Sequence, residues 1–191
     1  MPTHTPDAHD HLAKRIADRS ATVGVIGLGY VGLPVARAFA DARLRVIGFD
    51  TDPAKIDAIA QQRTYLKHLG ASFIAELLAT GNFEAALAPA RLDEPDALLI
   101  CVPTPLDDDN NPDLRYVEST ARDIARAIDP AALDARARLV CLESTTYPGT
   151  TRDVLAPILA STGRTPGEDL FVAFSPERED PGRAGATTAT I

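Results

Sequence analysis

The chain has 191 residues, which is enough for one domain with a substantial hydrophobic core. Its 19 lysine and arginine residues against 27 aspartate and glutamate residues give a net charge of −8, which disfavours binding to a phosphate backbone. No apolar run approaches the roughly 20 residues that span a bilayer, and the N-terminal residues contain no apolar signal-peptide segment. We therefore expect a cytoplasmic protein that binds neither nucleic acid nor membrane.

Short apolar runs typical of buried strands alternate along the chain with stretches of helical periodicity. This alternation predicts an α/β fold, a doubly wound and mostly parallel sheet in a single domain over residues 12–180. Residues 1–11 are polar and are predicted to be disordered, with a short packing helix possible at 12–19, and residues 181–191 are predicted to form a C-terminal tail. The predicted strands are 22–26, 45–49, 83–87, 97–102, 138–142 and 170–174. The predicted helices lie near 31–39, 53–60, 72–79, 117–128 and 151–160.

The two cysteines, Cys101 and Cys141, each lie inside an apolar run and are predicted to be small buried hydrophobic residues. A catalytic thiolate would need an exposed, electropositive setting, which neither sequence neighbourhood indicates. Three of the four histidines crowd the polar N-terminus, where a metal site would lack the fixed partners that hold its ligands. We therefore predict no metal site.

The segment Gly27–Gly32 matches the pattern G-x-G-x-x-G, which is weak evidence alone but gains weight from its context. It follows a predicted strand, opens a predicted helix, and is followed by Asp50 at the end of the next strand, as in the dinucleotide-binding fingerprint of Rossmann folds. Gly27 permits the tight turn, Gly29 lets the backbone approach a pyrophosphate, and Gly32 allows close helix–strand packing. Asp50 would accept hydrogen bonds from ribose hydroxyls and repel a 2′-phosphate, which favours NAD over NADP. A turn without cofactor, a flavin or a nucleotide sugar are the alternatives.

Further polar residues follow three of the later predicted strands. Thr104 lies in Val102–Pro105, Thr146 in Glu143–Gly149, and Glu177 follows Ser175-Pro176. In a doubly wound sheet, ligands bind outside the carboxyl ends of the strands, so these residues are candidates for cofactor contact and proton handling. Strand termination by proline is the alternative explanation for Thr104, and helix capping and turn chemistry are the alternatives for the other two segments.

Taken together, these motifs resemble the N-terminal NAD-binding domain of the UDP-glucose/GDP-mannose dehydrogenase family. The resemblance is carried by Val25–Pro34, the Asp50-x-x-x-x-Lys55 spacing, and the three polar strand ends described above, so it covers residues 22 to about 182. Within the family, segments 64–68 and 174–182 are similar to the branch that acts on UDP-N-acetylglucosamine. The cofactor-binding positions that the resemblance implies are Gly27, Leu28, Gly29, Tyr30, Val31, Asp50, Lys55, Val102, Thr104 and Thr146.

The family oxidises the C6 alcohol of a nucleotide sugar to a carboxylate with two molecules of NAD, through a thioester on a cysteine in a second domain. The resemblance implies that Thr146 helps to position the catalytic water and that Glu177 assists thioester hydrolysis. The sequence ends at Ile191, before the family's connecting helix and UDP-sugar-binding domain, and Gly182–Gly185 departs from the family pattern. We therefore expect this chain to bind NAD without turnover, and its uncovered apolar surface to favour homo-oligomers.

Three interpretations follow from the sequence. The first is the NAD-binding domain of a UDP-N-acetylglucosamine 6-dehydrogenase of surface polysaccharide biosynthesis, with UDP-glucose or GDP-mannose dehydrogenases as alternatives within the family. The second is a non-catalytic NAD-binding module. The third is an NAD-dependent dehydrogenase of another substrate class that uses Thr146 and Glu177 directly.

Overall fold

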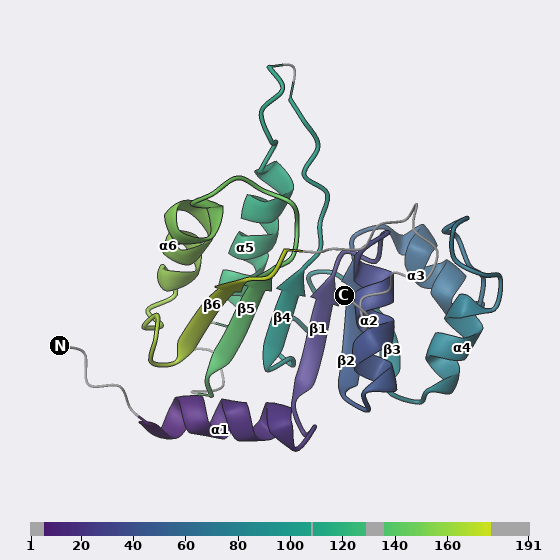
Figure 1. Cartoon of the computed structure of the whole chain (residues 1–191), viewed down its shortest axis with the longest axis horizontal. Helices are drawn as coiled ribbons and strands as arrows, with labels where there is room; N and C mark the ends of the chain where they lie inside the picture. Colours follow the sequence, from purple (N-terminus) through teal and green to yellow (C-terminus); the bar gives the residue numbers. More distant parts are fainter. Residues whose placement is uncertain (1–5, 108, 129–135, 177–191) are drawn as a thin grey trace.

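The computed structural model describes residues 6–107, 109–128 and 136–176, and within these ranges the fold is built on one six-stranded sheet (Figure 1). The strand order is β3-β2-β1-β4-β5-β6, and every neighbouring pair is parallel. The predicted doubly wound parallel sheet is therefore confirmed, in the strand order typical of Rossmann folds. The strands are β1 (Thr22–Ile26), β2 (Arg45–Asp50), β3 (Phe83–Leu87), β4 (Ala97–Ile100), β5 (Arg138–Leu142) and β6 (Leu170–Phe174).

Helices cover the two faces of the sheet, and alternate strand residues supply a separate core on each face. In β4, for example, Leu99 packs with one set of helices, whereas Leu98 and Ile100 pack with the other set. This alternation follows from the twofold repeat of a strand, and burial on both faces explains why the strands read as continuous apolar runs. One face carries α2 (Gly32–Asp41), α3 (Pro53–Ala60) and α4 (Phe73–Ala79), and the other carries α5 (Arg115–Ala127), a π-helical turn η1 (Thr151–Leu155) and α6 (Ala156–Ala160).

Local sequence signals account for the helix boundaries. Asp52 caps α3, because its side chain accepts a hydrogen bond from the Ala54 N–H at 2.9 Å, and Pro53 occupies the first helical position. The segment 151–160, predicted as one helix, divides into η1 and α6. Pro157 explains the division, because its nitrogen cannot donate to the preceding turn and its ring crowds that turn, which favours the wider π-helical turn.

The N-terminal helix α1 (Pro6–Ala17) begins earlier than predicted and lies across the amino ends of the strands (Figure 1). The prediction of disorder over residues 1–11 is therefore wrong for 6–11, whereas residues 1–5 lie outside the described ranges. Tertiary contacts explain the helix: Leu12 is buried, Arg15 pairs with the buried carboxylate of Asp96, and the His9 ring packs edge-on against Phe171 of β6. These contacts could not be predicted from the polar sequence of α1, because each partner is distant along the chain.

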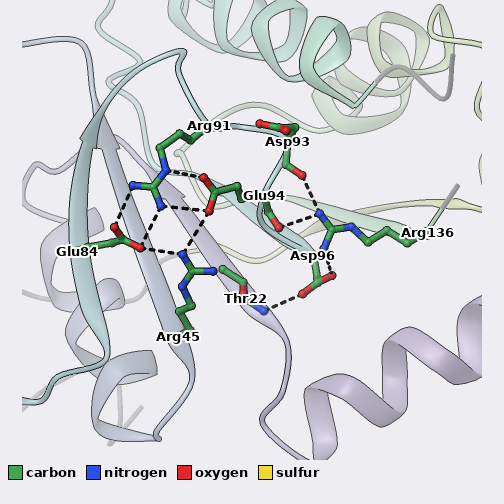
Figure 2. A network of polar contacts seen from close by, with 8 residues as sticks. All are labelled: Thr22, Arg45, Glu84, Arg91, Asp93, Glu94, Asp96 and Arg136. Carbon is green, nitrogen blue, oxygen red and sulfur yellow. Dashed lines mark hydrogen bonds and ion pairs between the residues drawn. The ribbon is translucent and has the colours of Figure 1, made fainter. Parts of the chain in front are cut away.

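A network of arginines and carboxylates holds the amino edge of the sheet together (Figure 2). Asp96 is buried and accepts a hydrogen bond from the Thr22 N–H at 2.8 Å, which joins β4 to the start of β1. Nearby, Glu84 of β3 accepts hydrogen bonds from Arg91 at 2.9 Å and from Arg45 of β2 at 2.9 Å. The charged groups of this network thus lie at the opposite edge from the carboxyl ends of the strands.

We predict that the Glu84 pairs make stability depend on acid pH. Hydrogen bonds from Arg91 and Arg45 lower the pKa of Glu84 from its usual 4.5 to about 2. A lowered carboxyl pKa stabilises the folded state above pH 4.5, and this contribution is lost as the pH falls from there through about 2. In chemical denaturation at a series of pH values, Glu84→Gln should lose less free energy of unfolding across this window than the parent. The difference should be small and salt-sensitive, because the Glu84 side chain is 43% exposed. Parallel pH profiles would contradict the prediction.

Candidate functional site: a cleft at the carboxyl edge of the sheet

An open cleft of about 700 Å³ lies at the carboxyl edge of the sheet. Its walls come from the glycine-rich segment after β1, from the ends of β2, β4 and β5, and from one side of α5. The strand order places β1 and β4 side by side, although the connections from these two strands run to opposite sides. Such a switch point is where open α/β sheets bind their ligands.

Each of the three glycines of the Gly27–Gly32 segment is suited to its position for a different structural reason. Gly27 has a φ of +96°, and a Cβ on it would lie 2.6 Å from the Cys101 carbonyl oxygen. A Cβ on Gly32 would lie only 1.8 Å from the Gly27 carbonyl oxygen, so the first turn of α2 packs directly on the loop. A Cβ on Gly29 would meet nothing within 4 Å. Gly27 and Gly32 are therefore required by the fold, whereas Gly29 leaves space for a ligand to approach the backbone.

Asp50, the last residue of β2, fixes this loop through its buried carboxylate. Its Oδ2 accepts hydrogen bonds from the Leu28 N–H at 2.9 Å and from the Lys55 ammonium at 2.7 Å. Its Oδ1 accepts from the Asp52 N–H at 3.0 Å, which also sets the start of α3. One carboxylate thus joins the glycine loop, the end of β2 and the next helix.

The loop between α3 and α4 packs over the glycine loop from the other side. The Tyr65 hydroxyl donates to the Leu28 carbonyl at 2.7 Å, and the ring of Tyr30 stacks with His68 at 4.5 Å between centroids. Burial, with the nearby Asp50 carboxylate, raises the pKa of Tyr65 above its usual value, so its hydroxyl remains a donor. Sequence reasoning did not assign Tyr65 a role. The available signal was Leu66, an apolar residue inside an otherwise polar loop, which the structure shows to be buried.

After the end of β4, Val102 and Thr104, which were predicted to contact the cofactor, line the cleft. The Thr104 hydroxyl donates to the Thr145 carbonyl at 2.6 Å, so it also ties the ends of β4 and β5 together. Thr146 is half-buried and is not among the residues that line the cleft. Glu177 lies outside the described residues.

Both cysteines are buried, as predicted, and Cys141 has a carboxylate neighbour. Its thiol contacts Oε1 of Glu143 at 3.4 Å, and Glu143 itself lines the cleft. Burial, followed by the charge of Glu143, raises the pKa of Cys141 to about 12. The thiol is therefore protonated at neutral pH and is no candidate nucleophile.

The fold and the cleft together define a dinucleotide-binding protein. The free space at Gly29 lies where a helix N-terminus receives a pyrophosphate, and the Asp50 carboxylate at the end of β2 lies where a ribose diol is recognised. A second negative group, the 2′-phosphate of NADP, would meet this carboxylate at close range. The residues present therefore fit NAD.

Comparison with known proteins shows which dinucleotide-binding family this is. Residues 21–190 match the family described as UDP-glucose/GDP-mannose dehydrogenase family, NAD binding domain. The match covers most of the chain, so the chain belongs to this family, and its cofactor is NAD. Within the described ranges, no helix combines the length and apolar composition that crossing a bilayer requires.

Several relatives are similar over most of this chain. The UDP-N-acetyl-D-mannosamine dehydrogenase of Escherichia coli K12 is 38% identical over 172 residues, which are 85% of this chain and 39% of that protein. Protein CapL of Staphylococcus aureus is 35% identical over 170 residues, which are 88% of this chain and 38% of that protein. The structure of a UDP-glucose dehydrogenase from Pyrobaculum islandicum matches with a TM-score of 0.76 at 34% identity, over 86% of this chain and 37% of that one. The chain thus spans less than two fifths of the length of these relatives.

The glycine geometry predicts opposite outcomes for two alanine substitutions. Gly29→Ala adds a methyl group to open space, so its free energy of unfolding should stay within about 1 kcal/mol of the parent. Its affinity for NAD should fall at least about tenfold, because the methyl group occupies the approach to the backbone. Gly32→Ala should lose about 3 kcal/mol or more of stability, because its methyl group overlaps a backbone oxygen. Chemical denaturation and calorimetric titration measure both; a Gly29→Ala variant with unchanged affinity would contradict the assignment.

Proposed function

We propose that this chain is the NAD-binding part of an enzyme that oxidises the C6 alcohol of a UDP-linked N-acetylhexosamine to a carboxylate. The observation that carries the proposal is the Asp50 carboxylate, which holds the glycine loop in place at the switch point of the sheet. The family membership gives the class of substrate, a nucleotide sugar. The family's cysteine chemistry would then come from outside this chain, because the thiol of Cys141 is buried with a high pKa and Cys101 is also buried.

In this proposal, Asp50 and Lys55 hold the adenosine ribose. The whole backbone from Leu28 to Val31 was expected to hold the pyrophosphate, but the Leu28 N–H already donates to Asp50. The N–H groups of Tyr30 and Val31, which have no acceptor among the described residues, are left for the pyrophosphate at the start of α2. Bound NAD supplies the hydride acceptor for the substrate carbon.

We further propose that Thr146 orients the water that hydrolyses the thioester and that Glu177 assists this step. The support is topological. The Ser175 N–H donates to the Leu142 carbonyl at 3.0 Å, so the chain leaves β6 beside the end of β5, the strand that leads to Thr146. A hydroxyl and a carboxylate that lie within hydrogen-bond reach of one water can orient it together.

The N-acetylated sugar is supported from two directions. Segments 64–68 and 174–182 resemble the branch that acts on UDP-N-acetylglucosamine, whereas the relatives from E. coli and Pyrococcus horikoshii carry the name UDP-N-acetyl-D-mannosamine dehydrogenase. The two sugars differ only in the configuration at C2. We therefore propose a UDP-N-acetylhexosamine as the substrate class, with both epimers tested.

Cofactor binding is tested by calorimetric titration of the purified chain with NAD and with NADP. The parent should bind NAD at least about tenfold more tightly than NADP, because Asp50 opposes the 2′-phosphate. Asp50→Ala should weaken NAD binding at least about tenfold, and Glu168→Ala, a change away from the cleft, should leave it unchanged. Equal affinity of the parent for both cofactors would contradict the role of Asp50.

The substrate class is tested by following NADH formation with UDP-N-acetylglucosamine, UDP-N-acetylmannosamine, UDP-glucose and GDP-mannose. The 191-residue chain should form no NADH with any of them. The protein expressed from its complete gene should prefer an N-acetylated sugar, and a preference for UDP-glucose or GDP-mannose would overturn the substrate proposal. Oxidation of a simple alcohol by the chain itself would instead favour a dehydrogenase of another class.

A further inference from the structure

Strand β2, which lies between β1 and β3 (Figure 1), has a buried glycine at position 48. Val46 of the same strand packs in the core on the α2 side of the sheet, and Gly48, two residues further on, faces the same side. A Cβ on Gly48 would lie 2.8 Å from Leu28 Cδ2 and 2.8 Å from Phe83 Cε2. The backbone of Gly48 does not have a positive φ, so a side chain is excluded here by lack of space and not by conformation.

Leu28 occupies the space that a side chain at position 48 would take. It belongs to the glycine loop, yet its side chain is fully buried and packs in the same core as Phe83 of the outer strand β3. Its backbone is held as well, because its N–H donates to Asp50 at 2.9 Å and its carbonyl accepts from Tyr65 at 2.7 Å. The glycine loop is therefore anchored in the core through the Leu28 side chain, and that anchor depends on the absence of a side chain from Gly48.

The position of Leu28 matters for the two residues that follow it closely in the loop. In the proposed function, the N–H groups of Tyr30 and Val31 donate to the pyrophosphate. Such hydrogen bonds require a separation of about 2.7–3.2 Å between donor and acceptor, so a small displacement of the loop weakens them. A methyl group on Gly48 would push its neighbours from 2.8 Å to about 3.5 Å, the distance at which carbon atoms attract each other.

We propose that Gly48 is a positioning residue for the pyrophosphate of the cofactor. Because Gly48 has no side chain, Leu28 can enter the core, and Leu28 in turn holds the N–H groups of Tyr30 and Val31 where the pyrophosphate needs them. Neither Gly48 nor Leu28 lines the cleft, so both act without touching the ligand. The inference rests on the proposed NAD binding and adds to it a determinant of affinity inside the core.

Gly24 of β1 offers a matched control on the opposite face of the sheet. A Cβ on Gly24 would lie 2.7 Å from Leu98 Cδ2 and 2.7 Å from Pro95 Cγ. Neither of these neighbours belongs to the glycine loop or lines the cleft. Gly24→Ala and Gly48→Ala thus each add one methyl group against side-chain atoms in the core, and both should lower the thermal unfolding midpoint.

The test is calorimetric titration with NAD at a temperature where every variant is folded. Gly48→Ala should bind NAD at least about tenfold more weakly than the parent, whereas Gly24→Ala should stay within about twofold. Adding Leu28→Val to Gly48→Ala removes one methylene where one methyl was added, so the core volume is nearly restored. This double variant should recover to within about threefold of the parent's affinity. A general loss of stability would weaken binding in Gly24→Ala as well and would not be reversed by Leu28→Val.

A folded Gly48→Ala variant with the parent's affinity would overturn the inference, because Phe83 alone would then have moved. An equal loss of affinity in Gly24→Ala and Gly48→Ala would also overturn it. If Gly48→Ala does not fold, Leu28→Ala decides, because it shortens the anchor and leaves β2 intact. That variant should bind NAD at least about fivefold more weakly, and unchanged affinity would overturn the inference.

Failure of the parent chain to bind NAD would contradict the proposed cofactor binding, and the positioning role with it. Tight binding by the parent together with unchanged binding by Gly48→Ala would contradict only the role of Gly48.

Discussion

The geometry of the cleft depends on one buried carboxylate. The two oxygens of Asp50 accept hydrogen bonds from the Leu28 N–H, the Asp52 N–H and the Lys55 ammonium. These donors belong to the glycine loop and to the start of α3, so a single side chain at the end of β2 aligns two further segments that contribute to the cleft. Because the hydroxyl of Tyr65 also donates to the carbonyl of Leu28, the loop is held in shape by contacts within the chain itself. Binding then costs less conformational entropy than it would with a mobile loop.

The charged residues that pair to stabilise the fold and the charged residues that line the cleft lie at opposite edges of the sheet. At the amino edge, arginines and carboxylates pair with one another, and Asp96 joins β4 to the start of β1 (Figure 2). Asp96 also pairs with Arg15 of α1. At the carboxyl edge, Asp50 at the end of β2 and Glu143 after β5 both line the cleft, and the strand order places the glycine loop, which follows β1, between these two strand ends. Parallel strands bring all their carboxyl ends to one edge, so the ligand-binding groups meet there although they are distant along the chain.

The sequence predicted the features that depend on short-range chemistry. The glycine spacing, the cap at Asp52 and the apolar runs of the strands each act within a few residues, and the structure has the predicted sheet. Other features depend on contacts between distant segments. Tyr65 reaches Leu28 across 37 positions, and α1 is held by Asp96, 81 positions beyond Arg15, so neither contact left a local pattern. The polar side of α5 that lines the cleft, with Tyr116, Ser119, Thr120 and Asp123, was also missed. Helical periodicity identified only the apolar side of α5, and a polar side is taken to face solvent until its neighbours are known.

We expect the hydrogen bonds of Asp50 to shape the glycine loop in the absence of cofactor. Hydrogen–deuterium exchange of the Leu28 amide in the chain without NAD tests it most directly. Because the Leu28 N–H donates to a buried carboxylate, we predict slow exchange in the parent and fast exchange in Asp50→Ala, while amides of the central strands β1 and β4 remain protected in both. Exchange of the Leu28 amide that is equally fast in both proteins would contradict it, and the loop would then acquire its shape only when NAD binds.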